Sequence, residues 1–204
     1  YGVGGAAAPY NPEPIALFFD AFLLGDGQEA IVDIADATDA AKSRNATRQK
    51  VQGYIARVPG ISVSSHFEIE CDGLHITKIE ALEGSAYEGT GTKHVTPHVT
   101  PRTVIDLDGT HYPTRPIIPN IKPVHERASI ETQRGCSQTC RFCQAAMITR
   151  STRQRKPETV LKPVKAQIKN SGADELGLLS FSARDYEPIN YVFEQLKCFS
   201  FFPI

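Results

Sequence analysis

The chain has 204 residues, of which 41% are hydrophobic, and its formal net charge is -1. This composition predicts a globular chain with one large or two small domains, and the charge excludes a protein that is basic throughout. No apolar run approaches the ~20 residues needed to cross a bilayer, and the N-terminus lacks a secretory signal. We therefore expect a soluble cytoplasmic protein without a membrane partner.

The two ends suggest an internal fragment of a longer protein. The chain begins at Tyr1 rather than Met and ends in an apolar tail, 198–204, that carries no helix stop signal.

The first sixty residues alternate apolar runs with glycine turns and helical patterns. After the glycine turn at 25–27, Ile31, Ile34 and Ala35 recur at helical spacing, and Asp26 can cap this helix. Strand, turn and helix in this order predict an α/β unit with a parallel sheet. The predicted elements are a strand end at 1–8, a short helix at 11–19, a strand at 21–24, a helix after Asp26 and a helix at 46–58.

From Ile61 the pattern changes to the alternation of a β-hairpin. Phe67, Ile69 and Cys71 share one face, and Asp72-Gly73 supplies the turn into a return strand. The following stretch, 90–123, is rich in proline and histidine, so we expect it to be extended and irregular and to link two domains.

The last part of the chain repeats the order strand, helix, strand, helix. A strand at 128–133 leads into a cysteine-rich loop, a helix begins at Pro157-Glu158 and contains Pro163, and a buried strand follows at 175–182. A final helix carries Ile189, Val192, Phe193 and Leu196 on one face. This order predicts the start of a parallel βα barrel or open sheet.

Three of the five cysteines have the spacing Cys136-x3-Cys140-x2-Cys143. Soft thiolates are the natural ligands of iron-sulfur clusters and of zinc. Three thiolates leave one iron of a four-iron cluster open, whereas a structural zinc site needs a fourth protein ligand. The sequence therefore favours an iron-sulfur cluster, with zinc as the alternative.

A fourth zinc ligand has no candidate at the short spacing typical of zinc fingers. We expect Cys71 and Cys198 to be ordinary buried thiols. The histidines show no paired metal-binding spacing and are expected in the linker and on the surface. His98, His111, His125 and Cys198 are the side chains that could complete a zinc site.

The segment Arg134-Gly-Cys136-x3-Cys140-x-Phe142-Cys143 resembles the cluster loop of the radical SAM superfamily. The resemblance implies that the three cysteines ligate a [4Fe-4S] cluster, that Phe142 lies near the adenine of S-adenosylmethionine (SAM), and that SAM binds the open iron. It also implies reductive cleavage of SAM to a deoxyadenosyl radical and an electron donor of the flavodoxin or ferredoxin type.

Other segments resemble an uncharacterised bacterial family in which a cobalamin-binding domain precedes the radical SAM core. They are Gly4-Gly5, Asn11-Pro-Glu-Pro14, 23–29 and 178–186. The resemblance implies three parts: the end of a Rossmann-like (flavodoxin-like) cobalamin domain at 1–60, a β-rich linker at 61–124, and the first units of a TIM-type barrel at 125–204. Cobalamin is then an expected cofactor of the full-length protein.

The end of the second barrel strand usually contacts SAM in this superfamily. Here that place holds Ser180, Ser182 and Asp185, and ligands of parallel βα folds gather at the carboxyl ends of strands. The alternative is that Ser and Asp cap a helix beginning near Tyr186. The two interpretations have equal weight from the sequence.

A basic run lies between Arg134 and Lys169, with nine lysines and arginines against one glutamate. It could bind RNA phosphates or neutralise an anionic cofactor, but aromatic residues do not interleave with it, so a solvated face is favoured.

Two functional hypotheses follow from these features. The first is a radical SAM enzyme that modifies RNA or a small molecule; the second is a non-enzymatic zinc or iron-sulfur module that binds RNA through the basic run. Only about two βα units follow Ala128, so the fragment can carry the motif without being active, and we expect poor stability in isolation.

Overall fold

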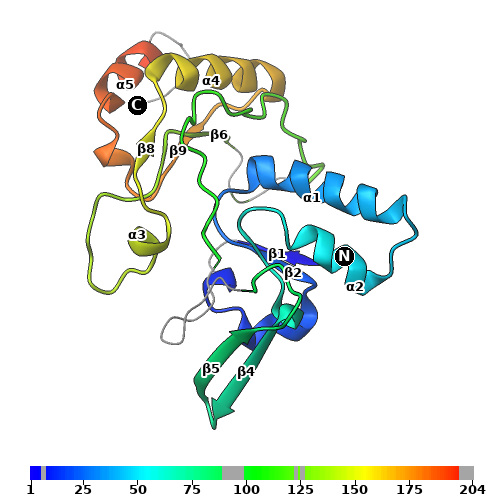
Figure 1. Ribbon diagram of the computed structural model, residues 1–204. Helices are drawn as coiled ribbons and strands as arrows, with labels where there is room; N and C mark the ends of the chain where they lie inside the picture. Colours follow the sequence, from blue (N-terminus) through cyan, green and yellow to red (C-terminus); the bar gives the residue numbers. More distant parts are fainter. Residues whose placement is uncertain (6–7, 89–98, 122–123, 125–126, 198–204) are drawn as a thin grey trace. The chain divides into compact units, whose positions relative to one another are not determined.

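The structure is a computed structural model that describes residues 1–5, 8–88, 99–121, 124 and 127–197. The chain divides into two compact units, Tyr1–Val104 and Ile105–Ile204. Figure 1 gives the element labels. Each unit is described by itself.

Unit 1 is built on a three-stranded sheet in the order β1-β2-β3. β1 (Val3–Gly4) pairs in parallel with β2 (Ala21–Leu23), and β3 (Ile61–Ser62) pairs antiparallel with β2. Between β1 and β2 the chain forms two short 3-10 helices, η1 (Ala8–Tyr10) and η2 (Glu13–Phe18). The short helix after Asn11 is thus confirmed, and the predicted parallel sheet is found for β1 and β2, whereas β3 makes the sheet mixed.

Helix α1 (Gly27–Lys42) follows the predicted glycine turn, but its buried face differs from the predicted one. Ala30 and Ala41 are buried on it, whereas Ile31 is 67% exposed. The predicted helix is therefore confirmed, and Ile34 packs against the core, but Ile31 and Ala35 lie outside its buried face. Asp26 occupies the N-cap position, yet its carboxylate accepts a hydrogen bond from the Val104 amide at 2.7 Å instead of capping the helix.

Helix α2 (Arg48–Ile55) confirms the second predicted helix, with shorter ends. Val51 and Ile55 are fully buried on it, because residues four apart share one helix face. They pack in a core with Ala21, Ile61 and Val63, and α2 also contacts α1. This core joins the sheet and both helices into one body.

The glycine turn after β2 is closed by the segment around Arg102. The Arg102 amide donates to the Leu24 carbonyl at 3.0 Å, and the Asp26 amide donates to the Arg102 carbonyl at 2.8 Å. A Cβ on Gly25, whose φ is +96°, would lie 2.0 Å from the Arg102 carbonyl oxygen. Only glycine fits this turn, because both the backbone conformation and the space exclude a side chain.

The predicted hairpin is present as β4 (Phe67–Asp72) and β5 (His75–Ala81), which pair antiparallel around Gly73. Figure 1 shows it projecting from the rest of unit 1. It is preceded by a 3-10 turn, η3 (Ser64–His66). Cys71 is exposed on this hairpin, so the prediction of a buried thiol there is wrong.

Unit 2 contains a parallel βα arrangement. β6 (Ala128–Glu131) pairs in parallel with β9 (Leu176–Leu179), in register Ala128 with Leu176. Helix α4 (Pro157–Ser171) connects them along the chain and packs against β6 and α5 (Ile189–Lys197). Ile130, Val160, Val164 and Val192 are fully buried in their common core.

Two details of α4 depend on its neighbours in the chain. The helix continues through Pro163, as its predicted range required. The start of the helix is hydrogen-bonded to a residue far away in the sequence. The Asp108 carboxylate accepts hydrogen bonds from the Lys156 amide at 2.9 Å and from the Thr159 hydroxyl. Gly172, with a φ of +70°, ends the helix.

The predicted α/β class is confirmed by these mixed sheets and helices. The division at residues 60 and 124 stays a prediction, and part of the proline-rich stretch, 89–98, lies outside the described residues. Within the described ranges, none of the helices is both long and apolar enough to span a bilayer.

Candidate functional site

The cysteine loop leaves the carboxyl end of β6 and is closed at its base by a second, short strand pair. β7 (Gln133–Arg134) pairs antiparallel with β8 (Arg153–Gln154), so the loop between them spans residues 135–152. The Thr132 amide donates to the Leu179 carbonyl, and the Arg155 amide donates to the Thr132 carbonyl. Both ends of the loop are therefore fixed beside the carboxyl end of the β6–β9 sheet.

Gly135 makes the tight turn into the loop. Its φ is +77°, and an added Cβ would lie 2.8 Å from the carbonyl oxygens of Thr149 and Ser151. The two sides of the loop thus approach each other at a distance that only glycine permits.

Two glutamines, one on each strand of this base, join it to the segment after β9. Gln133 is 2% exposed, and its amide donates to the Ser182 carbonyl at 2.8 Å. The Gln154 amide donates to the Gln133 side-chain oxygen at 3.1 Å and to the Asp185 carbonyl at 3.0 Å. Backbone groups at both ends of 182–185 are thereby held by the loop base.

Arg155 anchors the same base to the body of unit 2. It is 3% exposed and donates to the Leu107 carbonyl, to the Thr110 hydroxyl at 3.0 Å and to the Glu131 carboxylate at 3.2 Å. Glu131 also accepts two hydrogen bonds from Arg134, at 2.7 and 2.9 Å. The carbonyl of Arg155 accepts a hydrogen bond from the Tyr186 hydroxyl at 2.9 Å, and burial is the largest cause that raises the pKa of Tyr186, to about 12.

The three cysteines lie on this loop, which Figure 1 shows extending away from α4 and α5. Cys140 is exposed, Cys136 and Cys143 are half-buried, and all three are free thiols. The Cys143 amide donates to the Cys140 carbonyl at 3.0 Å, and the short helix α3 (Ala145–Ile148) follows.

The donor chemistry of this loop fits an iron-sulfur cluster, because three unpaired thiols stand on eight residues of one anchored loop. The thiols do not form a closed ligand set. Among the residues that the structure describes, no three His, Cys, Asp or Glu side chains gather closely enough to hold a metal ion.

The predicted SAM contacts lie on the loop and after the second strand. Phe142 is 92% exposed on the cysteine loop. Ser180 directly follows β9, and its hydroxyl oxygen is buried without a hydrogen-bond partner. Thr132, which directly follows β6, is fully buried and also carries an unpartnered hydroxyl. Two unsatisfied hydroxyls thus stand at the carboxyl ends of adjacent parallel strands, where ligands of such folds bind.

Asp185 and Ser182 do not cap a helix from their side chains. α5 begins at Ile189, not near Tyr186, and Ser182 precedes the 3-10 turn η4 (Ala183–Asp185) without a side-chain cap. The Asp185 carboxylate instead accepts hydrogen bonds from Gln138 at 2.8 Å and Ser137 at 3.0 Å, both on the cysteine loop. Hydrogen bonds from Gln138, Ser182 and Ser137 lower the pKa of Asp185 below its usual value.

The basic run is split by the fold. Arg134 and Arg155 form ion pairs with Glu131 inside unit 2. Lys162, Lys165 and Lys169 are exposed along α4. These lysines are spaced three and four residues apart and share one helix face, as expected for a solvated face.

The remaining candidate metal ligands are dispersed. His75 and His111 are exposed, and His66 is half-buried, with burial lowering its pKa. His94, His98, His125 and Cys198 lie outside the described residues.

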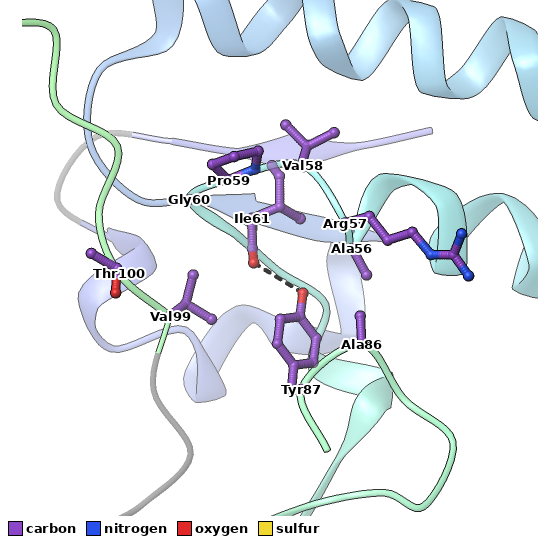
Figure 2. A pocket seen from close by; sticks show the side chains of 10 residues that line it. All are labelled: Ala56, Arg57, Val58, Pro59, Gly60, Ile61, Ala86, Tyr87, Val99 and Thr100. Carbon is purple, nitrogen blue, oxygen red and sulfur yellow. Dashed lines mark hydrogen bonds between the residues drawn. The ribbon is translucent and has the colours of Figure 1, made fainter. Parts of the chain in front are cut away.

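Unit 1 contains a cavity of about 510 Å³ beside the turn between α2 and β3. Figure 2 shows Tyr87 pointing its hydroxyl at the Ile61 carbonyl, to which it donates at 2.9 Å. The Val63 amide donates to the same hydroxyl at 3.2 Å, and burial raises the pKa of Tyr87 to about 12. The Tyr87 hydroxyl is therefore hydrogen-bonded to two backbone groups. The other lining side chains are mainly apolar: Ala56, Val58, Pro59, Ala86 and Val99.

Sequence reasoning did not identify Ser137, Gln138, Gln133 or Gln154 as parts of this site. Their partners lie 21 to 49 residues away along the chain. The available signal was a glutamine close before the cysteine loop and another close after it, since an amide side chain can both donate and accept hydrogen bonds.

The comparisons with known proteins bear on unit 1. Residues 2–64 match the family model described as "Radical SAM proteins, N-terminal". No curated protein matches the chain. The matched range contains the sheet β1-β2-β3 and both helices of unit 1, whereas the cysteine loop lies outside it. Residues 2–64 are thus similar to the N-terminal part of radical SAM proteins, and this match supports the membership in that superfamily that the cysteine spacing indicated independently.

Proposed function

We propose that this chain carries the cofactor-binding part of a radical SAM enzyme, in which Cys136, Cys140 and Cys143 hold a [4Fe-4S] cluster and SAM binds the open iron. The observation that carries the proposal is the three-cysteine loop at the carboxyl end of β6, anchored beside the end of the parallel strand β9. The family match to residues 2–64 supports it from a separate part of the chain.

Each residue has a role that its position supports. The cysteines supply three thiolates, and the cluster with SAM supplies a deoxyadenosyl radical that abstracts hydrogen from the substrate. Phe142, on the same loop, offers an exposed ring for stacking on the adenine. Ser180 and Ser182 follow the carboxyl end of β9, where the unpartnered Ser180 hydroxyl can donate to SAM. Asp185, predicted together with them, uses its carboxylate to accept hydrogen bonds from the cysteine loop.

The finer fold assignments belong to the same proposal. The order β6, α4, β9, α5 with parallel strands is that expected for the first two units of a TIM-type barrel. The parallel pair β1-β2 followed by the glycine turn and α1 is that expected at the end of a Rossmann-like cobalamin domain. Cobalamin, an electron donor of the flavodoxin or ferredoxin type, an RNA or small-molecule substrate and a cytoplasmic location remain predictions.

Anaerobic reconstitution of the full chain with iron and sulfide tests the function. We expect bound iron and acid-labile sulfide and, after addition of a strong reductant, conversion of SAM to deoxyadenosine and methionine, measured by mass spectrometry. Cys140→Ala should abolish the conversion, because only two thiolates of the set remain. Cys71→Ala is the matched control, since Cys71 is also an exposed thiol, on the β4–β5 hairpin, and it should retain the conversion.

Two results would contradict the proposal. One is that the reconstituted wild-type chain binds no iron and sulfide, and that its metal content equals that of Cys140→Ala. The other is one zinc per chain with no SAM turnover, which would favour the alternative of a structural metal module.

A further inference from the structure

We infer that Asp185 is a positioning residue that fixes the cysteine loop to the segment after β9. The loop that carries the three thiols is thereby held at a fixed position relative to Ser180 and Ser182. The inference deepens the proposed function and rests on it. The contact that carries it is the pair of hydrogen bonds from Ser137 and Gln138 to one oxygen of the Asp185 carboxylate.

The position of these two donors gives the contact its meaning. Ser137 and Gln138 belong to the three-residue spacer between Cys136 and Cys140. The loop has two fixed ends at β7 and β8, and Asp185 adds a third attachment within its first half. A loop with three attachments has fewer accessible conformations than one held only at its ends, which lowers the entropy lost when its thiols gather around a metal.

The acceptor itself is held in place. The carbonyl of Asp185 accepts a hydrogen bond from Gln154, and the carbonyl of Ser182 accepts one from the buried Gln133. Both glutamines belong to the strand pair at the base of the loop. The segment 182–185 is therefore attached to the loop base through its backbone and to the outer loop through one carboxylate.

This arrangement couples two groups that the proposed chemistry needs side by side. The segment that presents Ser180 and Ser182 is the one that ends in Asp185. If the tether is lost, the thiols remain but the loop is free to shift relative to these serines. We expect such a shift to weaken SAM binding more than cluster assembly. Residues that orient the ligands of a metal site without binding the metal typically affect affinity or activity by about 10- to 100-fold.

The chemistry of the pair allows a rescue in which the donor and the acceptor exchange places. Gln138→Glu places a second carboxylate against Asp185, so the two like charges repel each other. Adding Asp185→Asn gives an amide that can donate to the new carboxylate at position 138 and still accept from Ser137. The double variant thus restores the contact with its direction reversed. Asp174→Asn is the control for loss of a carboxylate, because Asp174 is exposed in the loop before β9.

The first arm of the test uses the full chain without metal and is independent of the proposed function. Trypsin cleavage after Arg141, an exposed residue between the second and third cysteines, is followed by mass spectrometry. We expect cleavage to be about 3-fold faster or more in Asp185→Ala and Gln138→Glu, because opening of the loop no longer breaks the tether. The double variant and Asp174→Asn should cleave at the wild-type rate.

The second arm uses the reconstituted chain. Asp185→Ala should retain iron and sulfide, while its apparent Kd for SAM, measured from the change that SAM causes in the EPR spectrum of the reduced cluster, should rise about 10-fold or more. The double variant should recover most of the wild-type SAM response. A role limited to stability would shift the unfolding transition and leave this spectral response unchanged.

The two arms separate the possible failures. Equal cleavage rates in wild type and Asp185→Ala overturn the tether, whatever the cluster does. Faster cleavage with an unchanged SAM response overturns the coupling. If Asp185→Ala is cleaved faster than wild type but the wild-type chain binds no cluster, the proposed function is overturned. The role of the tether in SAM binding is then overturned with it.

Discussion

The base and the outer part of the cysteine loop differ in how the protein holds them. At the base, Gln133 and Arg155 are 2% and 3% exposed, and the side chains of both residues donate hydrogen bonds to other parts of unit 2. On the outer part, Cys140 is exposed, Phe142 is 92% exposed, and one carboxylate from outside the loop, that of Asp185, contacts the spacer between two cysteines.

This difference matches what a ligand-binding loop requires. A rigid base fixes where the ligands start and end, and a loosely held outer part lets three thiols adjust to a cluster of fixed geometry. We therefore expect substitutions at the base to change the stability of unit 2, and substitutions on the outer part to change ligand binding with little effect on stability.

The largest expected effect is at the base, for Arg155→Met. Removing the buried guanidinium leaves the Leu107 carbonyl and the Thr110 hydroxyl without this donor and takes one partner from Glu131. We expect unit 2 to lose about 3 kcal/mol of stability, measured by urea unfolding with hydrogen exchange of α4.

Lys162→Met is the matched control for Arg155→Met. Lys162 carries the same charge but is exposed on α4, so its replacement should change the free energy of unfolding by less than about 0.5 kcal/mol. Equal effects of the two substitutions would show that the base is not the rigid part.

A smaller effect is expected for Gly135→Ala, at the junction of the two parts. The methyl group would meet the carbonyl oxygens of Thr149 and Ser151 at 2.8 Å, in a left-handed backbone conformation. Gly172→Ala shares the positive φ but meets nothing within 4 Å, so it serves as the control. We expect Gly172→Ala to cost about 1 kcal/mol and Gly135→Ala at least about 1 kcal/mol more, by thermal unfolding. Similar costs would mean that the loop sides can separate freely.

The smallest effect on stability is expected for Phe142→Ala. Its ring is 92% exposed, so truncation should change the free energy of unfolding of the metal-free chain by less than about 0.5 kcal/mol. Because we propose that the ring stacks on the adenine, the same variant should weaken SAM binding in the reconstituted chain. Phe193→Ala on α5, 47% exposed, should cost more stability and leave SAM binding unchanged. The reverse pattern would contradict the distinction between base and outer loop.

Much of the fold follows from local patterns in the sequence. Period-two alternation indicated the β4–β5 hairpin, and helical periodicity with Pro157 and Gly172 at the ends indicated α4. The buried face of α1 was not predictable in this way. Ala30, Ile34 and Ala41 face the core there, whereas Ile31 and Val32 are exposed, and only the tertiary packing of α2 and the sheet decides between these faces.

The candidate site was predictable only as a set of ligands. Cysteine spacing is local, so three thiols on eight residues indicated cluster chemistry directly. The contacts that hold the loop join residues far apart in the chain, as Asp185 does with Ser137, 48 residues away. A sequence motif marks neither partner of such a pair, because the contact is created by the parallel pairing of β6 with β9.

The central claim is that three protein thiolates leave one iron of the cluster open to SAM, and Mössbauer spectroscopy of the reconstituted chain tests it most directly. The account predicts about four irons per chain, with one iron site whose signal separates from the other three when SAM is added. Four iron sites that stay alike with and without SAM, or a reconstituted chain without iron, would contradict it.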